Sequence, residues 1–211
     1  MKFLSPDSDF MNAVSRIVDY IIINLLCVLF SIPVITAGAA FTAKFYVAMK
    51  IERGEEPKVW NSFVKSFRDN FKQTTIIWSV ILFTGAIIAW DWYSILLGDS
   101  KGMFFAGKII FLVMTVVWWS VAYNIFPFIA RFEMSTKEAL KGALAFTFLN
   151  PHKMLVILIA TVLPYIIEAW YIEWALAIWL LCTTATLYYV AKMYVMEFGK
   201  IEEKQFTAQE I

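Results

Sequence analysis

The chain has 211 residues, of which 61% are hydrophobic and 17% are charged, whereas soluble globular domains carry about 45–50% apolar and about 25% charged residues. This composition excludes an ordinary soluble enzyme. The formal net charge is +1, so there is no cationic excess to release counterions from nucleic acid, and we expect no nucleic-acid partner.

Several stretches lack Asp, Glu, Lys and Arg, and a helix of about 20 such residues crosses the hydrocarbon core of a membrane. These runs cover residues 20–43, 73–90, 109–130 and 174–191. A fifth run, residues 154–167, reaches spanning length if Glu168 and Glu173 lie at the membrane surface. The sequence therefore predicts an all-α, polytopic transmembrane bundle that forms a single integral membrane domain over residues 1–211.

The first charge-free run is interrupted by Ser31-Ile32-Pro33. Proline is favoured in the first turn of a helix, and the residue before it is pushed away from helical torsions. We therefore favour a hairpin of residues 10–31 and 33–51, which gives six spans; one kinked span instead gives five. In the hairpin Asp19 and Lys44 lie at similar distances from the turn. Because an isolated charge in mid-membrane costs on the order of 2.5–3.5 kcal/mol, these two residues are predicted to form an intramembrane pair.

Orientation follows from the distribution of Lys and Arg, which accumulate in cytoplasmic loops. The six-span arrangement places 16 of these residues on one side against two on the other, and the five-span arrangement places 14 against four. Both put the large loops and the C-terminus in the cytoplasm. The stronger bias favours six spans with both ends inside.

Two segments on the predicted cytoplasmic side have the pattern of amphipathic helices. The first covers residues 58–72, and the second begins at Ser135, where Ser135 and Glu138 have capping-box spacing, and ends at Asn150-Pro151. Such helices either shield loop backbone at the membrane interface or dock a partner protein. The candidate docking residues are Trp60, Phe63, Phe67, Phe71, Leu140 and Leu144.

Residues that carry chemistry are scarce. The sequence has no nucleophile elbow, phosphate-binding loop, dinucleotide fingerprint or metal-binding helix motif, and His152 is its single histidine. Cys27 and Cys182 both lie in apolar runs, which suggests neither a disulfide framework nor a metal site. We therefore expect no enzymatic activity, no cofactor and no metal.

Carboxylates and aromatic rings gather near the predicted outer face. This mixture is typical of sugar sites, because carboxylates accept hydrogen bonds from hydroxyls and rings stack on C–H faces. Tyr and Trp are also enriched at membrane interfaces in general, so the same residues are consistent with an interfacial belt. The candidate vestibule residues are Asp91, Trp92, Glu168, Trp170, Glu173 and Trp174.

Other polar and aromatic residues lie near mid-membrane. Buried polar groups mark solute pathways, so the sequence allows a pathway through Asp19, Asn24, Trp118, Trp119 and Asn124. The Trp pair is equally consistent with helix packing. A stripe of small residues that begins at Gly38 permits close contact between helices, either within the chain or in a homo-oligomer.

The segments 31–40, 50–56, 66–75 and 126–133 resemble the YesL-like family of bacterial integral membrane proteins, whose function is unknown. The resemblance implies a multi-pass protein of the Gram-positive plasma membrane, encoded beside carbohydrate ABC importers and glycan-degrading enzymes. It supplies no catalytic residues. The resulting hypothesis is a non-enzymatic partner of a carbohydrate uptake system, which acts on an ABC permease or ATPase subunit; the alternative is a small-solute carrier or channel.

Overall fold

The computed structural model describes residues 9–97, 105–132, 134–170 and 175–209, and all regular structure in these segments is helical. The prediction of an all-α protein is confirmed. The elements are α1 (Asp9–Ser31), the short 3-10 helix η2 (Val34–Thr36), α2 (Ala37–Glu52), α3 (Val59–Leu97), α4 (Phe105–Arg131), α5 (Thr136–Leu149), α6 (Pro151–Trp170) and α7 (Ala175–Gln209).

Four helices of the described segments are long and apolar enough to cross a membrane: Phe10–Ser31, Val34–Glu52, Val59–Leu97 and Ala106–Arg131. A fifth is counted if Thr136–Leu149 and Pro151–Leu163, which meet at 98°, form one broken span. A polytopic membrane protein is confirmed, with four to five candidate spans rather than the preferred six. The predicted break after Ser31 is also confirmed, because α1 ends there and α2 is a separate helix.

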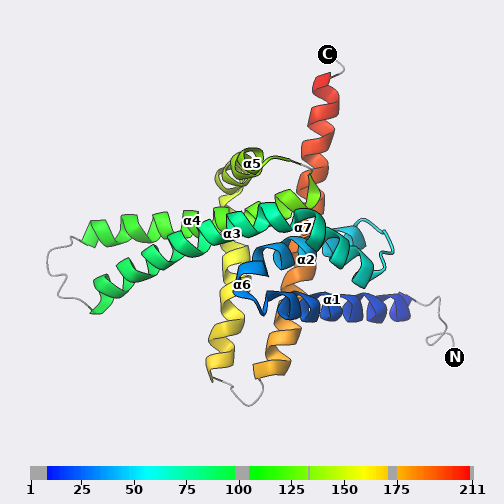
Figure 1. The fold of residues 1–211 in the computed structure, drawn as a ribbon, viewed down its shortest axis with the longest axis horizontal. Coiled ribbons are helices and arrows are strands. Elements are labelled where there is room, and N and C mark those ends of the chain that lie inside the picture. Colours follow the sequence, from blue (N-terminus) through cyan, green and yellow to red (C-terminus); the bar gives the residue numbers. More distant parts are fainter. Residues whose placement is uncertain (1–8, 98–104, 133, 171–174, 210–211) are drawn as a thin grey trace.

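Helix α2 lies at the centre of the arrangement and packs against α1, α3, α4 and α7. In the view of Figure 1, α3 and α4 extend to the left as one hairpin, whereas α6 and α7 extend downward as another. Small side chains allow this crowding, since Ala39, Ala40 and Ala43 have no exposed surface. The two hairpins therefore diverge from a common contact with α2.

Gly38 marks the closest approach between α2 and α3. A Cβ atom at this position would lie 2.6 Å from the carbonyl oxygen of Thr74 and 2.6 Å from Cβ of Trp78. The small-residue stripe is thus used for packing within the chain. It is not available for the homo-oligomer contact that the sequence also allowed.

The amphipathic segment 58–72 is not a separate helix, which corrects the prediction. It is the first part of α3, which continues for 39 residues and measures about 58 Å along its axis. No proline or glycine separates the amphipathic part from the span that follows it, so nothing ends the helix between them. Because the hydrocarbon core is about 30 Å thick, α3 extends well beyond it.

Helix α5, in contrast, is an independent amphipathic helix as predicted. The side chain of Ser135 accepts a hydrogen bond from the backbone N–H of Glu138, whose carboxylate accepts one from the backbone N–H of Ser135 at 2.8 Å. This capping box satisfies two backbone donors at the helix start. The helix ends before Asn150, and Pro151 starts α6 at a position where a missing N–H costs nothing.

Ion pairs tie α4 and α6 to the C-terminal part of α7. Arg131 at the end of α4 pairs with Glu202 of α7 at 2.7 Å, and Lys153 at the start of α6 pairs with Glu197 of α7 at 2.8 Å. Hydrogen bonds from Lys153 and Lys200 hold the pKa of Glu197 below its usual range. These contacts fasten α4 and α6 to the long extension of α7.

Candidate binding site within the membrane domain

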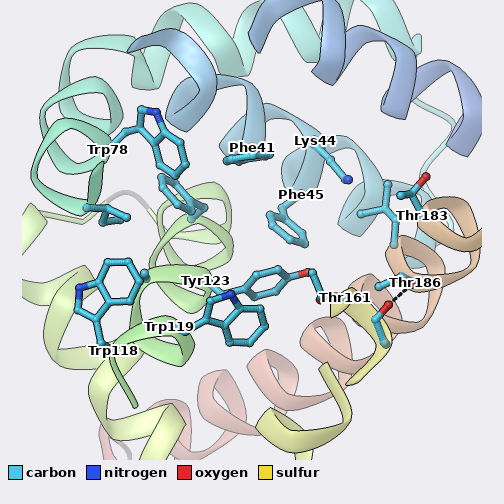
Figure 2. Close-up of a pocket in the computed structure, with 15 residues that line it drawn as sticks. Phe41, Lys44, Phe45, Trp78, Trp118, Trp119, Tyr123, Thr161, Thr183 and Thr186 are labelled. Carbon is cyan, nitrogen blue, oxygen red and sulfur yellow. Dashed lines mark hydrogen bonds between the residues drawn. The ribbon is translucent and has the colours of Figure 1, made fainter. Parts of the chain in front are cut away.

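A cavity of about 330 Å³ lies where α2, α3, α4, α6 and α7 meet (Figure 2). Its volume is at the lower end of the range of about 300–1,000 Å³ that is usual for small-molecule sites. Side chains from both hairpins and from α2 line it: Phe41, Lys44, Phe45, Trp78, Ile81, Trp118, Trp119, Ala122, Tyr123, Phe126, Ala160, Thr161, Thr183, Thr186 and Leu187.

One wall of the cavity consists of aromatic rings held in fixed positions. Phe41, Trp78 and Phe126 are in mutual contact, with ring centroids 5.5 to 6.0 Å apart. The indole N–H of Trp78 donates to the carbonyl oxygen of Val34 at 2.7 Å, and that of Trp118 donates to Thr84 Oγ1 at 3.1 Å. Because both donors are already used, these two indoles present apolar faces to the cavity.

Three threonines line the opposite wall, on α6 and α7. Their hydroxyls donate to backbone carbonyls: Thr161 to Ile157 at 2.6 Å, Thr183 to Trp179 at 2.6 Å and Thr186 to Ala160 at 3.1 Å. A hydroxyl that donates its proton keeps lone pairs for accepting. Toward a ligand, this wall therefore offers acceptors and no free hydroxyl protons.

Of the described residues that line the cavity, Lys44 alone is charged. Figure 2 shows its nitrogen directed toward the α7 side, where Thr183 and Thr186 lie. An ammonium group has three donors and strongly prefers to use them. No hydrogen bond or ion pair joins Lys44 to any residue in the described part of the chain, so its charge has no counterion there.

The predicted pair of Asp19 and Lys44 is not formed. Asp19 faces a different, polar cavity, which it shares with Ile51 and Lys58. The equal-depth argument fails because α2 begins at Ala37, after a bend and the 3-10 turn. Lys44 is thus only seven residues into α2, whereas Asp19 is twelve residues before the end of α1. At about 1.5 Å per residue, Lys44 is displaced by more than one turn toward the opposite end.

The other residues of the proposed pathway are divided between structure and cavity. Asn24 of α1 donates to Thr184 Oγ1 of α7 at 3.3 Å and is buried there. Asn124 is fully buried in a separate polar contact among α4, α5, α6 and α7. Only Trp118 and Trp119 of the predicted set line the cavity.

The candidate docking residues do not form one surface. Phe63 has no exposed surface, and Phe67 is half-buried; both pack on Phe30 of α1, with ring centroids 5.4 and 4.9 Å away. These two residues belong to the core, which corrects the prediction. The exposed members are Trp60, Phe71, Leu140 and Leu144.

The candidate outer vestibule is only partly described. Asp91 is exposed, and the indole N–H of Trp92 donates to Thr115 Oγ1 of α4 at 3.2 Å. Trp92 therefore joins the two helices of the α3–α4 hairpin. The side chains of Glu168 and Trp170, and the residues Glu173 and Trp174, lie outside the described residues.

Most of the cavity was missed by the sequence analysis, which identified Lys44, Trp118 and Trp119 but not the threonines or Tyr123. A local signal was present: Trp119 and Tyr123 are four residues apart, and Thr183 and Thr186 are three apart, so each pair shares a helix face. The rings of Trp119 and Tyr123 indeed stack at 5.2 Å. No local pattern, however, predicts that the Trp119 face of α4 and the Thr183 face of α7 line the same cavity.

These features define a polytopic helical membrane protein with a cavity inside its membrane domain. Residues 20–92 match a family model with the description "Protein of unknown function, DUF624". This match confirms the YesL-like resemblance over the matched segment. The matched segment contains α2 and most of α3. It therefore includes the lining residues that these two helices contribute to the cavity, Lys44 among them. No curated protein and no solved structure matches the chain.

Proposed function

We propose that this protein is a non-enzymatic membrane protein that binds a small solute inside the bilayer, in the cavity between the α3–α4 and α6–α7 hairpins. The observation that carries the proposal is the position of Lys44. A charge at membrane depth is costly, and such residues mark functional sites by default. Here the ammonium faces a cavity of ligand size instead of a counterion.

The absence of catalysis is supported by the cavity lining. None of the described residues that line it carries a carboxylate, an imidazole or a thiol, the groups that most often serve as acid, base or nucleophile. General acid–base or nucleophilic catalysis needs such a group within hydrogen-bond reach. The lining is suited to binding a solute rather than to converting it.

The proposal is tested by photocrosslinking on the full-length protein in lipid nanodiscs. The probes are a diazirine-bearing palmitate and its methyl ester, and labelled peptides are identified by mass spectrometry. We expect at least one probe to label residues 118–123 and 183–187 in a saturable manner that excess unlabelled compound suppresses. Ala122→Phe and, from the other hairpin, Ala160→Phe fill the cavity and remove this labelling.

The matched control is Ala106→Phe, the same change at an exposed position of the same helix as Ala122. It leaves the saturable labelling intact. Binding in the cavity is refuted if both probes label only lipid-exposed positions, without saturation, in the wild-type protein and in all variants that remain monodisperse.

Orientation and location are also part of the proposal. The C-terminal part of α7 carries the ion pairs of Arg131 and Lys153, and basic residues accumulate on the cytoplasmic side of membrane proteins. We assign this end, with the C-terminus, to the cytoplasm of a bacterial plasma membrane. The YesL-like resemblance supports the same location.

A second candidate function is that of a partner in a carbohydrate ABC uptake system. It is favoured by one face of α5, on which Leu140, Leu144 and Phe148 follow one another at four-residue spacing and are all exposed. Apolar residues at this spacing are typical of a helix that docks in a groove of a partner protein. The YesL-like resemblance supplies the kind of partner, a permease or ATPase subunit of an importer.

This second function is tested by crosslinking and affinity purification of the tagged protein from native membranes of sugar-grown cells. We expect importer subunits in stoichiometric amounts, and their loss in Leu144→Lys. Ala145→Lys, beside Lys141 on the neighbouring face of α5, is the matched control and retains them. Recovery of the tagged chain without importer subunits contradicts this function.

A further inference from the structure

We propose that the occupant of the Lys44 cavity is an anionic amphiphile, a molecule with one carboxylate or phosphate head group and a single apolar chain. This inference rests on the proposed function, because it names the chemical class of the solute that the cavity binds. It follows from three properties of the lining: its charge, its hydrogen-bonding capacity and its apolar area.

The first property is charge. Among the described residues that line the cavity, Lys44 supplies the only formal charge, and it is positive. Aromatic faces such as those of Trp118, Trp119 and Tyr123 attract cations in general, but a neighbouring ammonium repels them. An anionic head group instead supplies the counterion that Lys44 lacks among the described residues. Hydrogen bonds between an ammonium and an anionic oxygen are about twice as strong as neutral ones.

The second property is the small number of polar groups. Lys44 of α2 supplies hydrogen-bond donors. The hydroxyls of Thr161, Thr183 and Thr186 on the opposite wall can only accept from a ligand, because each already donates to a backbone carbonyl. A sugar has many hydroxyls, and each one left without a partner in an apolar site costs free energy. The three threonine acceptors and Lys44 are too few for the many hydroxyls of a sugar, whereas one anionic head group finds its hydrogen-bond donors in Lys44.

The third property is the apolar surface on both sides of Lys44. Trp78, Ile81 and Trp118 come from the α3–α4 hairpin, and Ala160 and Leu187 come from the α6–α7 hairpin. A single alkyl chain that extends from a head group at Lys44 contacts both hairpins. The same molecule therefore satisfies the charge of Lys44 and covers the aromatic wall.

The test uses the full-length protein in nanodiscs of neutral lipid and the photoreactive palmitate as probe. Unlabelled competitors share one chain and differ in head group: palmitate, hexadecyl phosphate, hexadecanol and hexadecyltrimethylammonium. We expect one or both anions to displace the probe from residues 118–123 at a concentration about tenfold lower than hexadecanol does, as one charged hydrogen bond predicts. The cationic compound displaces it least. The order of palmitate and hexadecyl phosphate identifies the preferred head group.

Lys44 is tested by two variants and a control. In Lys44→Met the advantage of the anions over hexadecanol disappears, whereas Lys44→Arg retains it because the charge is kept. Lys50→Met, which removes a lysine that pairs with Glu55 outside the cavity, leaves the advantage unchanged. Lys44→Met also unfolds at a higher temperature than the ligand-free wild type, since an unpaired charge has been removed from the membrane domain.

The results separate the two levels of the proposal. If hexadecanol competes as well as palmitate and hexadecyl phosphate do in the wild type, the cavity binds apolar chains without regard to charge, and the anionic class is refuted while the proposed function stands. The same conclusion follows if Lys44→Met keeps the preference for anions. If neither the palmitate probe nor its methyl ester gives saturable labelling of the cavity, the proposed function itself fails.

Discussion

Gly38→Ala is expected to destabilise the protein strongly, although alanine is the better helix former. The added Cβ would lie 2.6 Å from both the Thr74 carbonyl oxygen and Cβ of Trp78, so α2 and α3 must separate. Overpacking of this kind costs about 1–3 kcal/mol, which exceeds the gain of up to about 1 kcal/mol from replacing glycine in a helix. Thermal unfolding of the purified protein in detergent, followed by circular dichroism, measures the loss.

Gly199→Ala is the matched control for this change. Gly199 lies in α7, and nothing is found within 4 Å of the position of an added Cβ. Here only helix propensity acts, so unfolding is expected at the same or a slightly higher temperature. If Gly38→Ala unfolds at the same temperature as Gly199→Ala, the close approach of α2 and α3 is wrong.

The Gly38 substitution also has a consequence for the cavity. Trp78 forms part of the aromatic wall, and its indole N–H is bound to Val34 of η2. A displacement of α3 away from α2 moves this ring and opens the wall. Saturable labelling of residues 118–123 by the palmitate probe should therefore fall together with stability.

Asn124→Leu is expected to have the second large effect, because Asn124 joins four helices. Its side-chain amide donates to Thr147 Oγ1 of α5 at 3.0 Å and to Met154 Sδ of α6 at 2.9 Å, and its oxygen accepts from the Tyr194 hydroxyl of α7. Leucine fills the volume but leaves the buried Tyr194 hydroxyl without this acceptor. Each buried polar group left unsatisfied costs about 1–3 kcal/mol, and the melting temperature should fall accordingly.

A double-mutant cycle distinguishes this polar contact from a packing effect. Tyr194→Phe removes the hydroxyl that Asn124→Leu leaves unsatisfied, so the double variant should be more stable than the sum of the two single effects predicts, by about 1 kcal/mol or more. Asn12→Leu, at an exposed position of α1, is the control and should change stability by no more than about 0.5 kcal/mol. Strict additivity between Asn124 and Tyr194 would show that their hydrogen bond contributes nothing.

The Gly38 and Asn124 predictions concern two different sources of stability, close helix packing and a buried hydrogen bond. Gly38 controls how closely α2 and α3 approach, through the absence of a side chain. Asn124 and Tyr194 hold α4 and α7 together by a polar contact, beside the cavity but not on its lining. Lys44 is the opposite case, a residue on the lining whose charge no described neighbour balances. An unbalanced charge of this kind in a membrane domain costs stability.

The sequence alone determined the features that depend on local patterns. Charge-free runs identified spanning helices, because the membrane requires long apolar segments. The Ser31-Ile32-Pro33 break between α1 and α2 was also recognised locally, since proline restricts its own torsions and those of the residue before it. The capping box of Ser135 and Glu138 set the start of α5 for the same kind of reason.

Only the tertiary structure decided which of these residues meet. A bend and one 3-10 turn shifted Lys44 along α2, away from Asp19 and into the cavity. Phe63 became a core residue because Phe30, on a helix far away in sequence, covers it. The cavity is lined by side chains of α2 and of two hairpins that are far apart in sequence, and these hairpins leave α2 in different directions (Figure 1). Angles and registers between helices are set by side-chain packing across long sequence separations, and neither periodicity nor local capping encodes them.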